Sequence, residues 1–155
     1  MPERSSKTKL RLREFLPYRL SVLSNTVSGK IADLYDREFG LSVWQWRVMA
    51  VLGEYAGITA TEIGQVTAMD KVAVSRAVSG LIDSGHVSRK PSPADGRRSI
   101  LSLTTKGKDV YDKIVPIALG AEHDLVETLS EPEREQLARL MEKLARTAEP
   151  DRPLW

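Results

Sequence analysis

The stretch DKVAVSRAVSGLIDSGHVSRKPSPADGRRSILSLT, residues 70–104, decides the fold of this chain. Its first half predicts an amphipathic helix, because apolar side chains recur at three- and four-residue steps from Val74 to Ile82. Asp70 can cap the start of this helix, and Gly85 can end it in a left-handed turn. The opposite face carries no acidic side chain for three turns, which suits insertion into the major groove of DNA. The polar and basic residues of that face are Lys71, Ser75, Arg76 and Ser79.

The second half of the stretch predicts a basic β-hairpin. Residues 86–90 and 99–104 flank the segment PSPADG, residues 91–96, whose turn chemistry cannot continue a helix. A hairpin directly after a recognition helix is a wing, and a wing arginine can enter the neighbouring minor groove, where the negative potential is enhanced. The charged residues of this hairpin are Arg89, Lys90, Arg97 and Arg98, with Asp95 as the one acid.

A second, shorter helix is predicted just upstream, in ITATEIGQVTAM, residues 58–69. Thr59 and Glu62 have the spacing of a capping box, and we expect Ile63 and Val66 to face inward. Two short helices joined by a three-residue turn are the signature of a helix-turn-helix. The helix pair alone is equally consistent with an ordinary αα-hairpin that has a solvated face, and the basic hairpin favours the DNA-binding interpretation.

A family resemblance follows from the hairpin. Residues 95–104 resemble the D-x-R-x-x-x-L-x-L-T wing motif of MarR-family transcription regulators, and residues 69–91 are similar to that family's recognition helix and first wing strand. The resemblance covers nearly the whole chain, because the flanking helices also come in the family's order. It implies that Asp95 holds the wing in shape, commonly by pairing with an arginine, while Arg97 contacts the minor groove.

The same resemblance assigns Ser75 and Arg76 to base readout in the recognition helix. Val72 departs from the family pattern, in which many members carry a small polar residue. This valine either contacts a thymine methyl group or packs inside the protein.

The remaining periodicity predicts three long helices: 15–39, 105–129 and one that begins after a capping box at residues 130–133. A third capping box, at residues 42–45, starts a helix that precedes the short one. The expected fold is mainly α (α+β), a winged helix-turn-helix with long N- and C-terminal dimerisation helices. Its expected parts are a basic N-terminal arm at 1–14 and a single domain at 15–155, with dimerisation helices at 15–40 and 105–148 around a lobe at 42–104.

Composition narrows the function classes. The net charge of +2 is split between a basic arm and wing and a more acidic C-terminal part, as expected of a nucleic-acid-binding surface. The chain has no cysteine, which excludes disulfides, thiolate zinc sites and the cysteine peroxide switch of some MarR-family members. Neither histidine has metal-ligand spacing, and we find no catalytic motif, so no enzyme, cofactor or metal is expected. No long apolar stretch or signal-peptide core occurs, which indicates a soluble cytoplasmic protein without a membrane partner.

A homodimer is expected because one recognition helix with one wing contacts too little DNA to select a site strongly. A two-fold dimer places two recognition helices about 34 Å apart, one DNA turn, and reads a palindrome. The alternative is a monomer whose long helices pack only on themselves.

A small-molecule effector is implied by the resemblance, since MarR-like proteins bind small, often aromatic, anionic ligands where the dimer helices meet the reading lobe. The side chains here that suit an aromatic acid or an acyl thioester are Tyr18, Trp44 and Arg47. The alternative is that Trp44 and Trp46 belong to the core and that Arg47 pairs with an acid.

Together these observations predict a sequence-specific double-stranded DNA-binding transcriptional regulator, a ligand-released repressor acting as a homodimer on a palindromic operator. Base readout falls to Lys71, Ser75 and Arg76, and minor-groove contact to Arg97 or Arg98. Phosphate contacts are expected from Thr59, Thr61, Arg89 and Lys90. The alternatives are a non-specific architectural DNA-binding protein and a winged-helix protein-interaction module, which would carry an apolar rather than a cationic wing.

Overall fold

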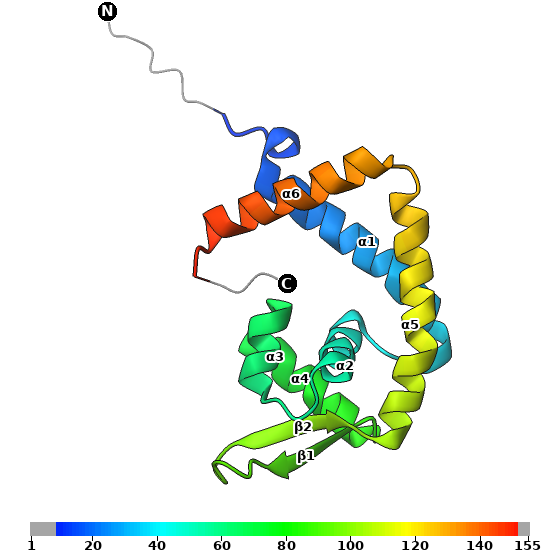
Figure 1. Cartoon of the computed structure of the whole chain (residues 1–155), viewed down its shortest axis with the longest axis vertical. Helices are drawn as coiled ribbons and strands as arrows, with labels where there is room; N and C mark the ends of the chain where they lie inside the picture. The colour runs from blue at the N-terminus through cyan, green and yellow to red at the C-terminus, as the bar shows by residue number, and fades with distance from the viewer. Residues whose placement is uncertain (1–8, 152–155) are drawn as a thin grey trace, which may run out of the picture.

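The computed structural model describes residues 9–151. Seven helical elements and two strands follow one another within this part of the chain (Figure 1). They are η1 (Leu12–Glu14), α1 (Leu16–Phe39), α2 (Val43–Glu54), α3 (Ala60–Thr67), α4 (Lys71–Asp83), β1 (Val87–Pro91), β2 (Ser99–Leu103), α5 (Thr105–Val126) and α6 (Glu131–Ala148). Most of the predicted basic arm lies outside the described residues.

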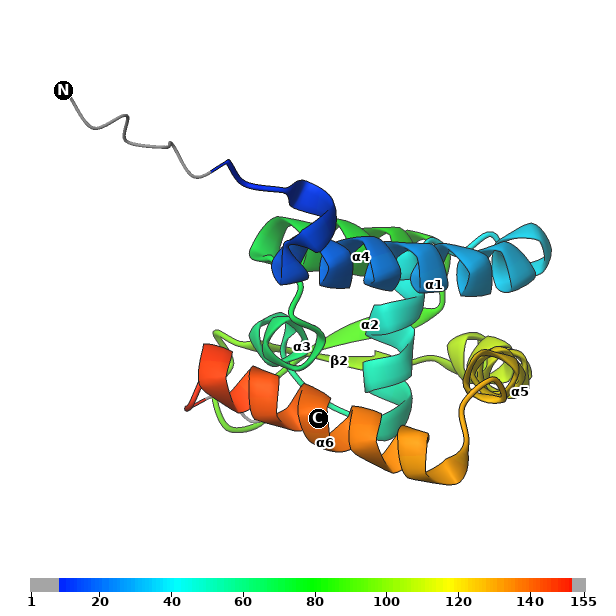
Figure 2. The same cartoon turned by 90° about the horizontal axis from the view of Figure 1, so that it is seen from above.

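The elements form a lobe and a set of long helices, as the mainly α winged helix-turn-helix prediction requires. Helices α2, α3 and α4 and the two-stranded sheet make up the lobe, and α5 runs along one side of it (Figure 1). Seen from above, α1 and α6 extend from the α5 side of the molecule as two separated arms (Figure 2). The predicted fold class is confirmed.

The helix starts follow the capping signals in the sequence. The Ser42 hydroxyl accepts a hydrogen bond from the Gln45 backbone N–H, at 3.1 Å, and the carboxylate of Asp70 accepts one from the Ala73 N–H, at 2.8 Å. The Thr59 N–H donates to Glu62, at 2.7 Å, which completes the predicted capping box of α3. The hydrogen bonds that Glu62 accepts from Thr59 lower the pKa of its carboxyl group.

The core joins the lobe to the long helices. Apolar side chains from α2 and α4 fill its centre, together with Ile63 of α3, Leu101 of β2 and Ile114 of α5. Tyr35 of α1 lies 5.8 Å from the ring of Trp46, measured between centroids, and this ring stacks in turn on Tyr111 of α5 at 5.9 Å. Burial raises the pKa of Tyr35 to about 12. This aromatic stack fastens three helices to one another.

Two details differ from the sequence-based prediction. Val66 is 56% exposed and does not face inward, so Ile63 alone anchors α3 in the core. Helix α5 ends at Val126 rather than at residue 129, because a turn through residues 127–129 precedes α6. The two differences concern the orientation of one side chain and the end of one helix, and both helices are predicted elements.

The long helices carry apolar side chains that their own protomer does not cover. Helix α6 has no buried residue, and no described element packs extensively against it. Its apolar stripe is 45–48% exposed and consists of Leu137, Leu140, Met141 and Leu144. Helix α1 likewise exposes Leu16, Leu20, Leu23 and Leu34. In the part of the chain that the structure describes, no helix has the length and apolar character needed to cross a membrane.

Candidate DNA-binding surface

Helix α4 presents the face predicted for base recognition to solvent. Its apolar stripe is buried against α2 and α3, which turns the opposite side outward. The exposed residues of that side are Lys71, Ser75, Arg76 and Ser79. Val72 is 58% exposed, so packing within the protomer does not account for this departure from the family pattern.

The turn between α3 and α4 is held in an unusual backbone conformation. Ala68 ends α3 with a φ of 55°, in the left-handed region that non-glycine residues rarely adopt. The Met69 N–H donates to the hydroxyl of Thr67, at 3.3 Å, and stabilises this turn. The tight turn directs the N-terminus of α4 away from α3, as a helix-turn-helix requires.

Two threonines at the start of α3 have different surroundings. The Thr59 hydroxyl donates its hydrogen to Glu62, at 2.8 Å, as part of the capping box. The hydroxyl is therefore not free to donate to a phosphate in this arrangement. Thr61 is exposed on the same end of the helix and is the better placed of the two for such a contact.

The wing is an antiparallel ladder from Val87↔Leu103 to Pro91↔Ser99. Its tip is held together locally, since the Arg97 N–H donates to the Asp95 carboxylate, at 3.0 Å, and the Arg98 N–H donates to the Asp95 carbonyl, at 2.9 Å. Asp95 thus shapes the loop through the backbone of Arg97, whereas the resemblance implied an arginine side chain as its partner.

The wing cations remain available to an external anion. Arg89, Lys90, Arg97 and Arg98 are partly or fully exposed, and none of them belongs to an ion pair formed within residues 9–151. Because the tip is fixed by its own backbone hydrogen bonds, two arginine side chains project from a defined loop.

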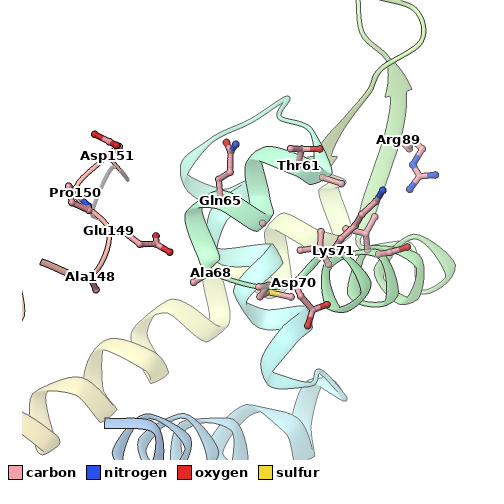
Figure 3. A pocket seen from close by; sticks show the side chains of 16 residues that line it. Thr61, Gln65, Ala68, Asp70, Lys71, Arg89, Ala148, Glu149, Pro150 and Asp151 are labelled. Carbon is pink, nitrogen blue, oxygen red and sulfur yellow. The ribbon is translucent and has the colours of Figure 1, made fainter. Parts of the chain in front are cut away.

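A groove of about 1170 Å³ borders this surface (Figure 3). Lys71 and Arg89 lie at one side of it, and Glu149 and Asp151, which follow α6, lie at the other. The wall that carries Lys71 also includes Asp70, so only the wall formed by Glu149 and Asp151 has charges of one sign. A second cavity of about 460 Å³ lies where α2 meets α4, between Trp44 and Arg76.

The structure brings together two of the three residues predicted to bind an effector. The Arg47 guanidinium donates to the hydroxyl of Ser28, at 3.2 Å, and its central carbon lies 5.1 Å from the ring centroid of Trp44. Tyr18 precedes Ser28 by ten residues of the same helix, about 15 Å along its axis. Tyr18 is therefore separated from Arg47 within one protomer.

The alternative that both tryptophans belong to the core applies to Trp46 and not to Trp44. Trp46 belongs to the aromatic stack of the core, but Trp44 is 48% exposed. Arg47 contacts a hydroxyl and an aromatic ring, and it forms no ion pair with any acid in residues 9–151. Sequence reasoning missed that Trp44 lines the same cavity as Arg76, because the two positions are far apart in the chain and no local pattern links them.

Comparisons with known proteins agree with this geometry. The model of the MarR family matches residues 39–98. The HTH-type transcriptional regulator BilQ of Clostridium symbiosum is 27% identical over 71% of this chain and 76% of its own length. The multiple antibiotic resistance protein MarR of Escherichia coli is 26% identical over 84% of this chain and 92% of its own.

Solved structures extend the similarity to the whole architecture. A MarR/EmrR family regulator from Acinetobacter sp. ADP1 superposes with a TM-score of 0.83 at 26% identity, covering 91% of this chain and 99% of the other. A mutant of Escherichia coli MarR in complex with operator DNA gives a TM-score of 0.76 at 25% identity, with coverages of 88% and 99%. In the sequence of residues 39–98 and in its overall architecture, the chain is similar to MarR-family winged helix-turn-helix transcriptional regulators.

Proposed function

We propose that this regulator is a homodimeric repressor that reads a palindromic operator and leaves it when a small molecule binds. The observation that carries the DNA-binding part is the exposed cationic surface of α4 and the wing, whose arginines form no ion pair within the described residues. Such a surface attracts phosphates and reads base edges. The operator complex of Escherichia coli MarR, a relative with the same fold, supports this proposal.

The surface divides into three proposed roles. Side chains of α4 read base edges in the major groove, wing arginines enter the minor groove, and residues at the edges of the lobe bind phosphates. The residues for base readout are Lys71, Ser75, Arg76 and Ser79. The minor-groove contacts fall to Arg97 and Arg98, with Asp95 holding the loop. The phosphate contacts fall to Thr61, Arg89 and Lys90, because the Thr59 hydroxyl is engaged in the capping box.

Two alanine variants test this assignment. Arg76→Ala and Arg97→Ala are each expected to weaken operator binding by about 1–3 kcal/mol, because each removes a groove contact made by a guanidinium group. The operator is first selected from random oligonucleotides with the wild-type protein, and dissociation constants are then compared at fixed salt concentration.

Arg139→Ala is the matched control, since it removes an exposed arginine of α6 outside the proposed surface. This control is expected to bind like the wild type. If both test variants retain wild-type affinity, the proposed reading surface is wrong. Equal binding of operator and random DNA by the wild-type protein would instead favour the architectural alternative.

The dimer is proposed from the uncovered apolar faces of the long helices. The exposed leucines of α1 and the stripe of α6 form surfaces that a second copy of the same chain would bury. We assign the helices within 15–40 and 105–148 to this interface and the segment 42–104 to the reading lobe.

The effector site is proposed at the junction of α1 and α2, where Arg47 joins Ser28 and Trp44. An exposed indole ring beside a guanidinium group suits a small aromatic anion, with the ring stacking and the carboxylate or thioester carbonyl accepting hydrogen bonds. A coupling of 1–3 kcal/mol between this site and DNA would change operator affinity roughly 5–150-fold.

Tryptophan fluorescence tests the effector proposal. Titration with a panel of aromatic acids and acyl thioesters is expected to reveal a ligand that quenches Trp44 and releases the operator. The variant Trp44→Phe identifies the responding ring, and Arg47→Met is expected to weaken that ligand roughly 10-fold or more. Arg37→Met, in the last turn of α1, serves as a matched control. A panel without any response, together with unchanged operator binding, would contradict a site at this junction.

A further inference from the structure

The C-terminal end of α4 is fastened to the first turn of α5. Lys106 Nζ donates to the Ser84 carbonyl, at 2.7 Å, and the Thr104 hydroxyl donates to the Gly85 carbonyl, at 2.6 Å. The Thr104 N–H donates to the carbonyl of His86, at 3.0 Å. A helix leaves its last carbonyls without partners inside the helix, so residues from α5 satisfy the end of the recognition helix and the turn that follows it. We call residues 84–86 and 104–107 the α4–α5 joint.

The joint is closely packed. A Cβ atom at Gly107 would lie 2.0 Å from the carbonyl oxygen of His86, so only glycine allows this approach of α5. His86 is 7% exposed, and its Nδ1 lies 2.6 Å from the Ser84 hydroxyl. Burial, and secondarily the charge of Lys106, lower the pKa of His86. The two helices therefore approach each other closely at His86 and Gly107, whereas the side-chain hydrogen bonds of Thr104 and Lys106 lie at the surface of the joint.

The joint also closes the base of the wing. The first ladder pair, Val87↔Leu103, is adjacent to it on both strands. Recognition helix, wing and α5 thus converge at a single place in the fold, which Figure 1 shows at the lower end of α5. Further along α5, Tyr111 stacks on Trp46 of the lobe and gives a second point of attachment.

Helix α5 connects the joint to the proposed dimer interface. Its 22 residues span about 33 Å. Neighbouring base pairs are about 3.4 Å apart. If α5 tilts by about 6° at the joint, its far end is therefore displaced by about one base-pair step. A dimer that reads two half-sites needs its recognition helices at a defined separation.

We propose that Thr104 and Lys106 are positioning residues that fix the angle between α5 and the recognition helix and thereby restrict the half-site spacing that the dimer accepts. The proposal rests on the proposed function, because it requires a dimer that binds a palindrome. Neither residue needs to touch DNA, since each acts by holding the carbonyl groups at the end of α4.

The test compares affinities for operators in which the distance between half-sites is changed by one base pair in either direction. The wild-type protein is expected to bind each altered operator roughly 10-fold or more weakly than the original one. A single mismatched base pair in a binding site commonly has an effect of this size. Lys106→Met, which keeps the apolar stem and removes the ammonium group, is expected to reduce that loss to less than threefold. Its affinity for a single half-site is expected to stay within about threefold of the wild type.

Lys108→Met is the matched control, because it removes the same charge from an exposed position two residues along α5. It is expected to keep the wild-type spacing profile. Thr104→Val is expected to behave like Lys106→Met, and Thr104→Ser, which retains the hydroxyl that also caps α5, should restore spacing selectivity. If Thr104→Val does not fold, Lys106→Met alone decides.

A wild-type spacing profile in Lys106→Met would overturn the role of the joint while leaving the proposed function intact. A wild-type protein that binds no palindrome at any spacing would contradict the proposed function itself. A change in stability alone, without a change in the spacing profile, would show that the joint is merely structural and would overturn the proposal.

Discussion

Replacement of Gly107 by alanine is expected to lower the free energy of unfolding by about 3 kcal/mol or more. The added methyl group would meet the carbonyl oxygen of His86 at 2.0 Å, and the two next nearest atoms are also backbone atoms of His86. A backbone segment fixed by the hydrogen bonds of Thr104 cannot move aside as a flexible side chain would. The substitution therefore forces apart the end of α4 and the start of α5. Urea unfolding at one fixed protein concentration measures the effect.

Gly120→Ala is the matched control for this experiment. Gly120 lies in the same helix, and a Cβ atom there would meet no atom within 4 Å. Alanine has the higher helix propensity, so this variant is expected to gain up to about 1 kcal/mol. The same substitution thus has opposite signs at two positions of α5. Equal stability of both variants would show that α5 does not approach the α4 turn as closely as described.

The variant Leu140→Glu is expected to convert the protein from a dimer to a monomer. Leu140 lies in the exposed apolar stripe of α6, which has no extensive packing partner in its own protomer. Burying a carboxylate without a partner at an apolar interface is strongly unfavourable, so we expect dimerisation to weaken by more than about 100-fold. Sedimentation equilibrium or light scattering at micromolar concentration gives the molecular mass directly.

Arg139→Glu places the same side chain on the opposite face of α6, about 200° around the helix from Leu137. It is expected to remain a dimer, which separates the effect of position from that of added charge. A wild-type protein that sediments as a monomer would remove the dimer from the proposed function. Leu140→Glu protein that remains dimeric would move the interface away from this stripe.

Features that depend on neighbours in the sequence could be predicted without the structure. The capping boxes at Ser42, Thr59 and Ser130 each need a partner only three residues away, and all three form. The stripe of α4 follows from helical periodicity and decides which side of the helix faces solvent. The wing is recognisable because turn residues and an apolar return strand fall within one short segment.

Features that depend on distant parts of the chain could not be predicted in this way. Tyr35 of α1 is buried because it packs against the lobe. Position 107 of α5 needs glycine because the backbone of His86 approaches it. Val66 is apolar and correctly spaced, yet α3 is short enough for Ile63 alone to hold it. The loop partner of Asp95 was assigned by resemblance to a side chain, whereas a backbone N–H group occupies that place.

The uncovered stripe of α6 affects how DNA binding by the proposed regulator depends on the concentration of the protein. If a second chain is what covers these leucines, the last helix gains its packing only when two molecules meet. Below the dissociation constant of the pair, halving the number of chains then lowers the number of assembled pairs about fourfold. Promoter occupancy would fall more steeply than protein supply, giving a threshold that a one-chain binder of equal affinity lacks.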